Sequence, residues 1–133
     1  MKLETPVKTI SASASEVFAF LSDLNNLESM MPEQVINWKS DKDSCSFTIK
    51  GMSDMHLVIQ DRLPDNKVVM ASASNKPFSF TLSSIIAPEG DQSQVKLAFD
   101  GDVNPFLKMM IEKPLSNFFN LLLDGLEKKF NTK

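Results

Sequence analysis

The sequence predicts an α+β fold in which a curved antiparallel sheet of about seven strands packs around a long C-terminal helix. Three observations support this fold class. Apolar residues recur with helical spacing near the N-terminus and again over residues 104–130. Between these two regions, six stretches alternate apolar and polar residues, as half-buried strands do. Short polar connectors join the six stretches, which favours hairpins and therefore antiparallel pairing.

The composition is that of an ordinary globular protein. The chain has 133 residues, of which 42% are hydrophobic and 23% are charged, and this length suits one domain. A net charge of −3 argues against sequence-independent binding to nucleic acid. The one cysteine, Cys45, cannot form an internal disulfide, and residues 1–10 carry charges where a signal peptide would be apolar. We therefore expect a cytoplasmic protein.

The N-terminal region predicts one strand followed by a two-part helical segment. Over residues 2–10, the alternation places Leu3, Thr5 and Val7 on one face, while Pro6 suggests an edge position or an irregular pairing. Residues 13–16 read Ser-Ala-Ser-Glu, a capping box that opens a helix. This helical region is interrupted at residues 25–26 and ends at residues 31–32, because a residue that precedes proline disfavours the α conformation.

Six strands are predicted in the middle of the chain, at residues 35–40, 44–50, 55–63, 67–74, 78–87 and 93–102. Cys45, Phe47 and Ile49 share a face, and serine, threonine and lysine occupy the opposite face of the same strand. The other strands alternate similarly, so one face of the sheet is covered and one is solvated. At residues 67–74 either phase is acceptable, because both Val68 with Met70 and the residues between them are apolar.

The C-terminal helix is expected to begin at Asn104, a good cap, and Pro105, a good first helical residue. Its apolar face before Pro114 lies roughly 140° from the face after it, so we expect a kink or a break at this proline. Residues 115–130 would then cover the sheet, while residues 106–111 would face a pocket mouth or a partner. Gly125, inside this helix, suggests a close approach to the sheet or to a ligand.

A resemblance to a known superfamily extends over nearly the whole chain. The residues that carry it are the segment ISASASEVFAFLSD at positions 10–23, Met31-Pro32, the meander of strands and the closing helix. In these features the chain resembles the helix-grip superfamily, which includes START lipid-binding domains, polyketide cyclases, pollen-allergen proteins and a family of carbon monoxide dehydrogenase subunits. The resemblance implies a β-α-α-β6-α order and a single helix-grip ligand-binding domain over residues 1–133. The matching motifs are structural and include no catalytic residue.

Few residues suit acid–base, nucleophilic or metal chemistry. His56 is the one histidine, and its strand parity points it to solvent. Arg62 has the same parity as His56, so we expect an outward ion pair there. Cys45 shares an apolar face and is expected to be buried and inert. We therefore predict no catalytic residue, no metal ligand and no cofactor, and we favour a non-enzymatic role.

The composition that favours a binding function is rich in apolar and conformationally adaptable side chains. Ten phenylalanines and eight methionines suit an interior that adapts to a flexible hydrophobic molecule such as a lipid, a quinone or a polyketide, although for any single methionine core filling is the favoured role. The ligand-binding residues predicted between sheet and helix are Phe47, Met55, Phe78, Phe80, Leu97, Phe99, Phe118 and Leu122. Ser72, Ser74 and Ser84 are the hydroxyls that could point inward and orient a ligand carbonyl.

The leading hypothesis is a binding or carrier module for a small apolar molecule, with access near residues 27–31 and 106–111. Two alternatives stay open: a cyclase-like or dehydratase-like enzyme, and a protein-interaction or assembly factor. In the latter, Phe106, Met109 and Met110 would contact a second copy or another protein. Stable membrane insertion is not expected, because the apolar run at residues 121–123 ends at Asp124 and is far too short to span a bilayer.

Overall fold

A computed structural model describes residues 1–74 and 78–131 and shows an α+β fold. The predicted connector at residues 75–77 lies outside the described residues. The elements, in chain order, are β1 (Lys2–Glu4), β2 (Lys8–Ile10), α1 (Ala14–Ser22), the 3₁₀ helix η1 (Leu24–Met30), β3 (Val35–Ser40), β4 (Ser44–Ile49), β5 (Ser53–Leu63), β6 (Lys67–Ser72), β7 (Phe80–Glu89), β8 (Gln92–Gly101) and α2 (Pro105–Asn131).

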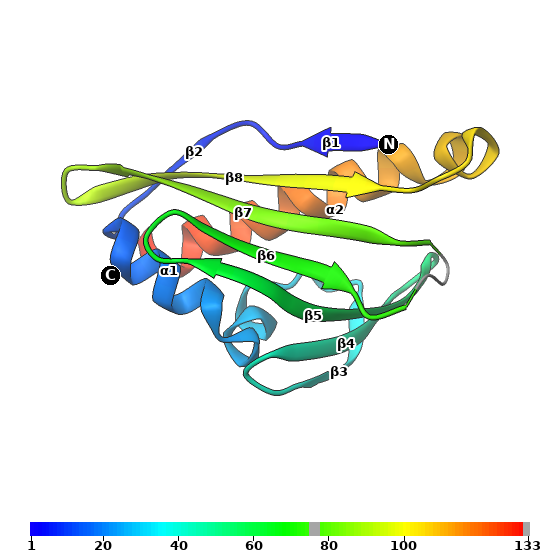
Figure 1. The fold of residues 1–133 in the computed structure, drawn as a ribbon, viewed down its shortest axis with the longest axis horizontal. Helices are drawn as coiled ribbons and strands as arrows, with labels where there is room; N and C mark the ends of the chain where they lie inside the picture. Colours follow the sequence, from blue (N-terminus) through cyan, green and yellow to red (C-terminus); the bar gives the residue numbers. More distant parts are fainter. Residues whose placement is uncertain (75–77, 132–133) are drawn as a thin grey trace.

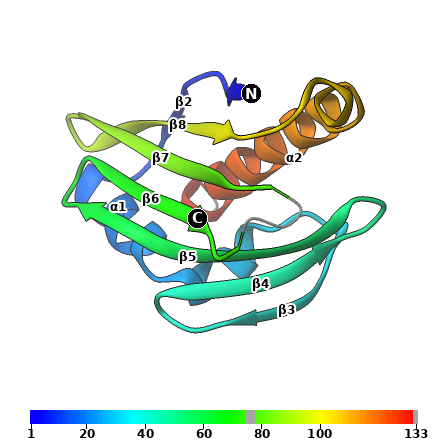
Figure 2. The ribbon, with the colours of Figure 1, turned by 45° about the vertical axis from the view of Figure 1, so that its right-hand side comes forward.

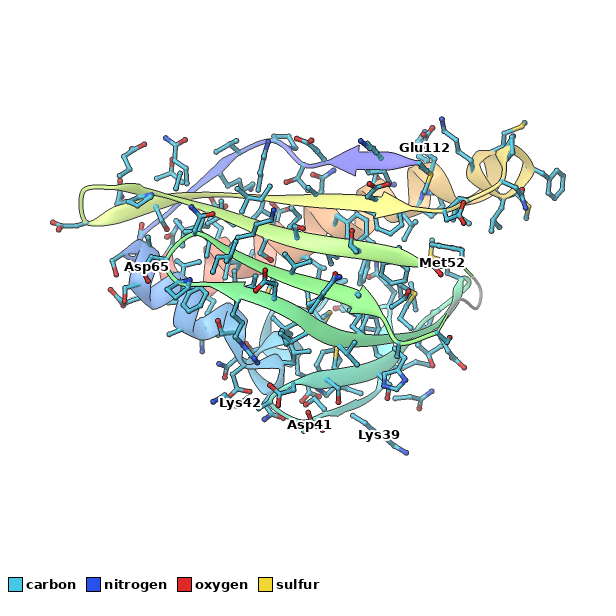
Figure 3. All side chains as sticks on the ribbon, in the orientation of Figure 1. Lys39, Asp41, Lys42, Met52, Asp65 and Glu112 are labelled. Carbon is cyan, nitrogen blue, oxygen red and sulfur yellow. The ribbon has the colours of Figure 1, made fainter. Side chains whose placement is uncertain are left out.

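The strands form one curved antiparallel sheet in the order β1-β8-β7-β6-β5-β4-β3, and β2 pairs with β8 as well. Figures 1 and 2 show this sheet bending around α2, which lies along its concave side. The β4–β5 turn, marked by Met52, and the β5–β6 turn, marked by Asp65, lie at opposite ends of the sheet (Figure 3). The predicted fold class, a curved sheet around a C-terminal helix, is therefore confirmed.

The six central strands were all predicted, and each observed boundary lies within two residues of the predicted one. The alternation of burial follows the predicted faces, with Cys45, Phe47 and Ile49 buried on the concave side. The structure also settles the phase of β6, because Val68 and Met70 are buried there. The period-two pattern was sufficient for β4 to β8 because their concave side is largely dry, whereas the edge strand β3 contains no fully buried residue.

The first predicted strand is in fact two short strands, because its pairing with β8 shifts by one residue at Pro6. Leu3 pairs with Phe99, and the same register continued along β8 would pair Lys8 with Gln94. Lys8 pairs with Val95 instead. Thr5 supports the break, since its Oγ1 accepts the Leu97 N–H at 3.0 Å. A one-residue shift reverses the faces, so the prediction that Val7 shares a face with Leu3 is wrong, and Val7 is 54% exposed.

The helices begin as their caps predict. At the start of α1, the Ser13 hydroxyl accepts the Glu16 N–H at 3.2 Å, which is half of the predicted capping box. At the start of α2, the Asn104 side-chain oxygen accepts the Leu107 N–H at 2.8 Å. These bonds satisfy amide groups that have no partner within the helix.

Pro114 does not break α2, so that part of the prediction is wrong. The helix is continuous from Pro105 to Asn131. The carbonyl that lacks its helical donor is that of Met110, four residues earlier, and both residues are exposed. Water can therefore replace the missing hydrogen bond, which removes much of the cost of a proline inside a helix.

The two apolar faces of α2 have the separate environments that the sequence predicts. The second half of the helix is buried against the sheet and α1–η1 through Leu115, Phe118, Phe119, Leu122, Leu123 and Leu126. In the first half, Phe106, Met109 and Met110 are 75%, 85% and 61% exposed. The first turns of α2 extend past the end of the sheet (Figure 1), and Glu112 points outward there (Figure 3).

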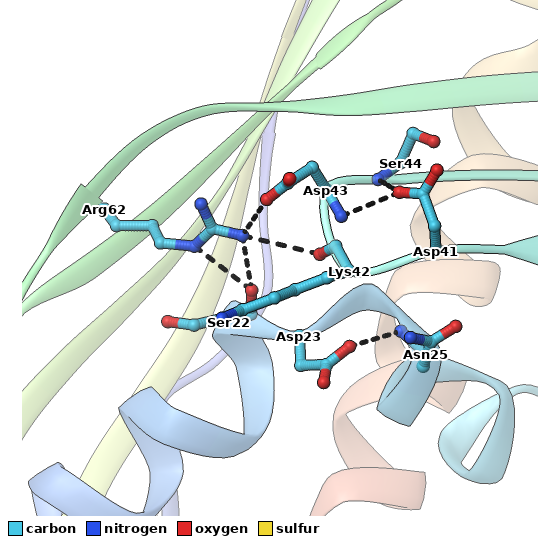
Figure 4. Close-up of polar contacts among 8 residues, drawn as sticks. All are labelled: Ser22, Asp23, Asn25, Asp41, Lys42, Asp43, Ser44 and Arg62. Atoms are coloured by element: carbon cyan, nitrogen blue, oxygen red, sulfur yellow. Dashed lines mark hydrogen bonds and ion pairs between the residues drawn. The ribbon is translucent and has the colours of Figure 1, made fainter.

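Arg62 does not lie on the face predicted for it. The pairing of β5 with β6 shifts between Ile59 and Asp61, and after this bulge Arg62 lies opposite the buried Val68, on the concave side. Its guanidinium donates to the Ser22 carbonyl oxygen from Nε at 3.1 Å and Nη2 at 2.7 Å. Nη2 also pairs with Asp43 at 2.8 Å (Figure 4), so the expected ion pair is present. Arg62 thus joins β5, the end of α1 and the β3–β4 turn.

Substituting Arg62 tests this junction. Arg62→Ala leaves the Ser22 carbonyl without its charged donor, and we expect the free energy of unfolding to fall by about 1–3 kcal/mol. Asp43→Ala removes only the more exposed partner and should cost less than about 1 kcal/mol. Urea denaturation of both variants measures the difference. Equal, small effects of the two substitutions would contradict the role of the carbonyl contacts.

Candidate functional site

The candidate site is an apolar cavity between the concave face of the sheet and the helices. The sheet side is formed by β4 to β8, and the opposite side by α1, the η1 segment and α2. The lining residues are Leu21, Leu27, Met30, Met31, Phe47, Met55, Leu57, Met70, Phe80, Leu82, Ser84, Leu97, Phe118, Phe119 and Leu122. The cavity therefore lies where the sequence places a binding site, between the strands and residues 115–130.

The cavity is small in this structure, with a volume of about 20 Å³. A water molecule needs roughly 10–15 Å³, whereas sites for small organic ligands are typically roughly 300–1,000 Å³. The side chains therefore almost fill the interior. A larger ligand would have to displace them or move the elements that cover the cavity.

The structure places the predicted ligand-binding residues in two groups. Six of the eight line the cavity: Phe47, Met55, Phe80, Leu97, Phe118 and Leu122. The other two, Phe78 and Phe99, do not line it and pack edge-on with ring centroids 6.2 Å apart. The Phe99 ring also packs against the Phe119 ring, with their centroids 5.3 Å apart. This contact supports α2 from the side of the sheet. Contact of these eight residues with a ligand remains a prediction.

The predicted set omitted the residues that cover the cavity from the side of α1 and η1. Leu21, Leu27, Met30 and Met31 all line it, and only Met31 among them is partly exposed. The sequence did single out residues 27–31 as an access region. The helical apolar spacing of residues 17–31 was a signal that could have added these side chains to the lining.

Gly125 allows η1 to lie directly on α2. A Cβ atom at this position would be only 2.3 Å from the Met30 carbonyl oxygen. The sequence predicted a close approach to the sheet or a ligand; the close approach is real, but the neighbour is η1. Because Met30 also lines the cavity, this contact holds one side of the cavity closed.

The lining carries one polar side chain, that of Ser84, and no ionisable group. The other two candidate hydroxyls lie elsewhere. Ser72 accepts the Phe80 N–H at 3.0 Å, and Ser74 is exposed. The cavity as described therefore offers hydrophobic contact and a single hydroxyl, and it holds no general acid or base.

The residues considered for nucleophilic chemistry are separate from this cavity. His56 is exposed on the outer face of β5, as predicted. Cys45 is 2% exposed, and burial raises the pKa of its thiol to about 12, so it stays protonated at neutral pH. Within residues 1–74 and 78–131 there is no group of three or more His, Cys, Asp or Glu that could hold a metal ion.

A curved sheet that grips a helix around an apolar cavity defines a helix-grip protein. The family model described as "Polyketide cyclase / dehydrase and lipid transport" matches residues 4–131, and the chain belongs to this family. The predicted superfamily is thereby confirmed. No curated protein matches the chain.

Solved structures share this fold at low sequence identity. A START superfamily protein from Mycobacterium smegmatis has a TM-score of 0.70 and 13% identity, covering 97% of this chain and 96% of its own. Norcoclaurine synthase from Thalictrum flavum has a TM-score of 0.74 and 12% identity, and the match covers 100% of this chain and 87% of the synthase chain. A protein from Thermus thermophilus has a TM-score of 0.72 and 16% identity, and the match covers 98% of this chain and 97% of that protein. These likenesses establish the fold.

The described helices include none that is both long and apolar enough to span a bilayer.

Gly125→Ala tests the contact that closes the cavity. Overpacking against a backbone carbonyl costs about 1–3 kcal/mol, and the helix preference of alanine returns about 1 kcal/mol of this. We expect a net loss of up to about 2 kcal/mol in the free energy of unfolding, with stronger binding of an apolar dye as η1 is displaced. Urea denaturation and dye fluorescence measure the two effects. Asn117→Ala, at an exposed site on the same helix, is the control, and a Gly125→Ala variant indistinguishable from it would contradict the interpretation.

Proposed function

We propose that residues 1–133 form a single ligand-binding domain that carries a small, flexible hydrophobic molecule in the cavity between the sheet and α2. The observation that carries this proposal is the lining: fourteen of its fifteen residues are apolar, and four of these are methionines. Unbranched methionine side chains change shape at little cost, so such an interior can repack around a guest. The lipid-transport part of the family description agrees with this role.

The energetics set a condition on how much surface a ligand must bury in this closed interior. Covering about 300 Å² of ligand surface contributes roughly 7 kcal/mol before the costs of association and of opening. A micromolar complex needs a net of about 8 kcal/mol, so the ligand must bury enough further surface to offset the costs of association, about 4–15 kcal/mol, and of opening as well. We propose that opening occurs where η1 meets α2, because Met30 and Met31 both line the cavity and end a short 3₁₀ segment.

A carrier role is favoured over a cyclase or dehydratase role by the absence of titratable side chains from the lining. Proton transfer needs a group within hydrogen-bond reach of the substrate. His56 lies on the outer face, and the guanidinium of Arg62 is occupied by Ser22 and Asp43. We place this carrier in the cytoplasm, in agreement with its one buried, free cysteine.

Native mass spectrometry of the protein purified from its own host tests the carrier role. We expect an extractable, non-covalent apolar compound to accompany the wild-type chain. Leu82→Phe, which fills the small remaining space, should reduce the bound fraction several-fold, because added core volume leaves no room without repacking. Leu63→Phe, the same change at a site that is 42% exposed and outside the cavity lining, is the matched control and should retain the compound. An empty wild-type protein that also ignores added apolar probes would refute the proposal.

A second proposal concerns the exposed apolar side chains of α2. Phe106, Met109 and Met110 lie at helical spacing i, i+3 and i+4, so they form one face, which protrudes beyond the sheet. Large apolar side chains grouped in this way are typical of contact surfaces. We propose that this face contacts a second copy of the chain.

Sedimentation tests the contact. We expect the wild-type protein to associate with rising concentration and a variant with serine at positions 106, 109 and 110 to remain monomeric. The substitutions lie on exposed positions, so the melting temperature should change little at low concentration. A wild-type chain that stays monomeric at millimolar concentration would exclude self-association through this face.

A further inference from the structure

The inner row of β7 contains one residue that breaks its apolar pattern. Phe80, Leu82, Ser84 and Ile86 point to the concave side and are all buried. Ser84 is 2% exposed. Its pairing partners on the two adjacent strands, Val68 on β6 and Leu97 on β8, are both apolar and buried. A hydroxyl in such a place is unfavourable unless a hydrogen bond satisfies it.

The buried hydroxyls next to the first strands have structural roles. Ser93 donates to the Ala12 carbonyl oxygen at 3.0 Å, and Thr5 accepts the Leu97 N–H at 3.0 Å. Both bonds attach the N-terminal segment to β8. Within the described residues no bond of this kind is found for the Ser84 side chain, which instead faces the cavity and is its one polar lining group. The position of Ser84 suits a guest molecule better than it suits the sheet.

We propose that the Ser84 hydroxyl binds the single polar oxygen of an uncharged hydrophobic ligand, such as a ketone, an ester, a quinone or an alcohol. The inference rests on the proposed function, since it names the class of molecule that the same cavity takes. Ser84 can donate to a carbonyl oxygen or accept from a ligand hydroxyl. The rest of the ligand would contact leucine, methionine and phenylalanine side chains.

Charged ligands of the same size do not fit this chemistry. The lining offers no lysine, arginine or histidine to a carboxylate or a phosphate, and an isolated ion is strongly disfavoured in an apolar interior. Two partly buried cations, Lys8 and Arg62, already have acidic partners. Lys8 pairs with Asp124 and Glu127, and Arg62 pairs with Asp43. A fatty acid could bind only with its carboxylate outside, away from Ser84.

Three compact probes of similar shape test the inference by NMR titration: acetophenone, α-methylstyrene, in which a CH₂ group replaces the carbonyl oxygen, and benzoate. In the wild-type protein we expect acetophenone and α-methylstyrene to shift resonances of lining residues and benzoate to leave them unchanged. Ser84→Ala should lower the affinity for acetophenone about two- to tenfold, which corresponds to the loss of one net hydrogen bond. The affinity for α-methylstyrene should stay the same or rise.

Ser83→Ala, one residue away on the outer face, is the matched control and should leave both affinities unchanged. Thermal melting separates ligand binding from a structural role. If Ser84 only stabilised the strand, Ser84→Ala would lower the melting temperature; we expect it to remain equal or increase.

The outcomes distinguish this inference from the proposed function. If neutral probes bind but acetophenone is insensitive to Ser84→Ala, or if benzoate binds equally well, the inference is wrong and the hydrophobic carrier survives. If none of the three probes binds at millimolar concentration, both the carrier role and the inference fail.

Discussion

The structure depends on the burial of one apolar sheet face by the second half of α2. An antiparallel sheet with a dry concave side must be covered, and Leu115 to Leu126 supply the only long helical face that the described chain offers for it. The curvature that lets eight strands surround one helix also keeps the centre of the sheet away from the helix axis. A cavity at this point is therefore a geometric consequence of the fold, and the side chains decide how much of it stays open.

In this chain the side chains leave very little of it open. Four methionines and several large aromatic and aliphatic residues reduce the interior to about 20 Å³. A rigid core of the same volume would exclude a guest. Methionine has no branched carbon and many accessible rotamers, so the same residues that fill the cavity can be rearranged at modest cost. The Gly125 contact with Met30 is therefore relevant to the proposed opening of the cavity, because it lies where one of these methionines meets α2.

The sequence was sufficient wherever a local pattern met a simple environment. Strands β4 to β8 were predicted because their concave side is dry, and the helix starts because Ser13 and Asn104 have local hydrogen-bond partners. Two of the errors arise where the pairing register of a strand changes. The shifts at Pro6 and between Ile59 and Asp61 reverse faces, so Val7 and Arg62 were assigned to the wrong side. Neither shift has a signal in the alternation itself, since each depends on hydrogen bonds to the neighbouring strand. Likewise, whether Phe99 lines a cavity or supports Phe119 depends on ring packing between distant segments.

The distribution of polar groups indicates what kind of site this chain can provide. Arg62 is used to join α1 to the β3–β4 turn, Thr5 and Ser93 attach the N-terminal segment, and Lys8 links β2 to α2. Each of these groups joins two elements of the fold: the charged ones are partly exposed, and the two hydroxyls are buried at β8. The cavity lining retains only Ser84. A cavity with one hydroxyl and no charged group in its lining could discriminate between neutral molecules by a single hydrogen bond, but it has no means of neutralising a buried charge. For the proposed carrier, specificity would therefore come from the shape of the cavity, from the adaptability of its methionines and from the position of one oxygen atom in the ligand.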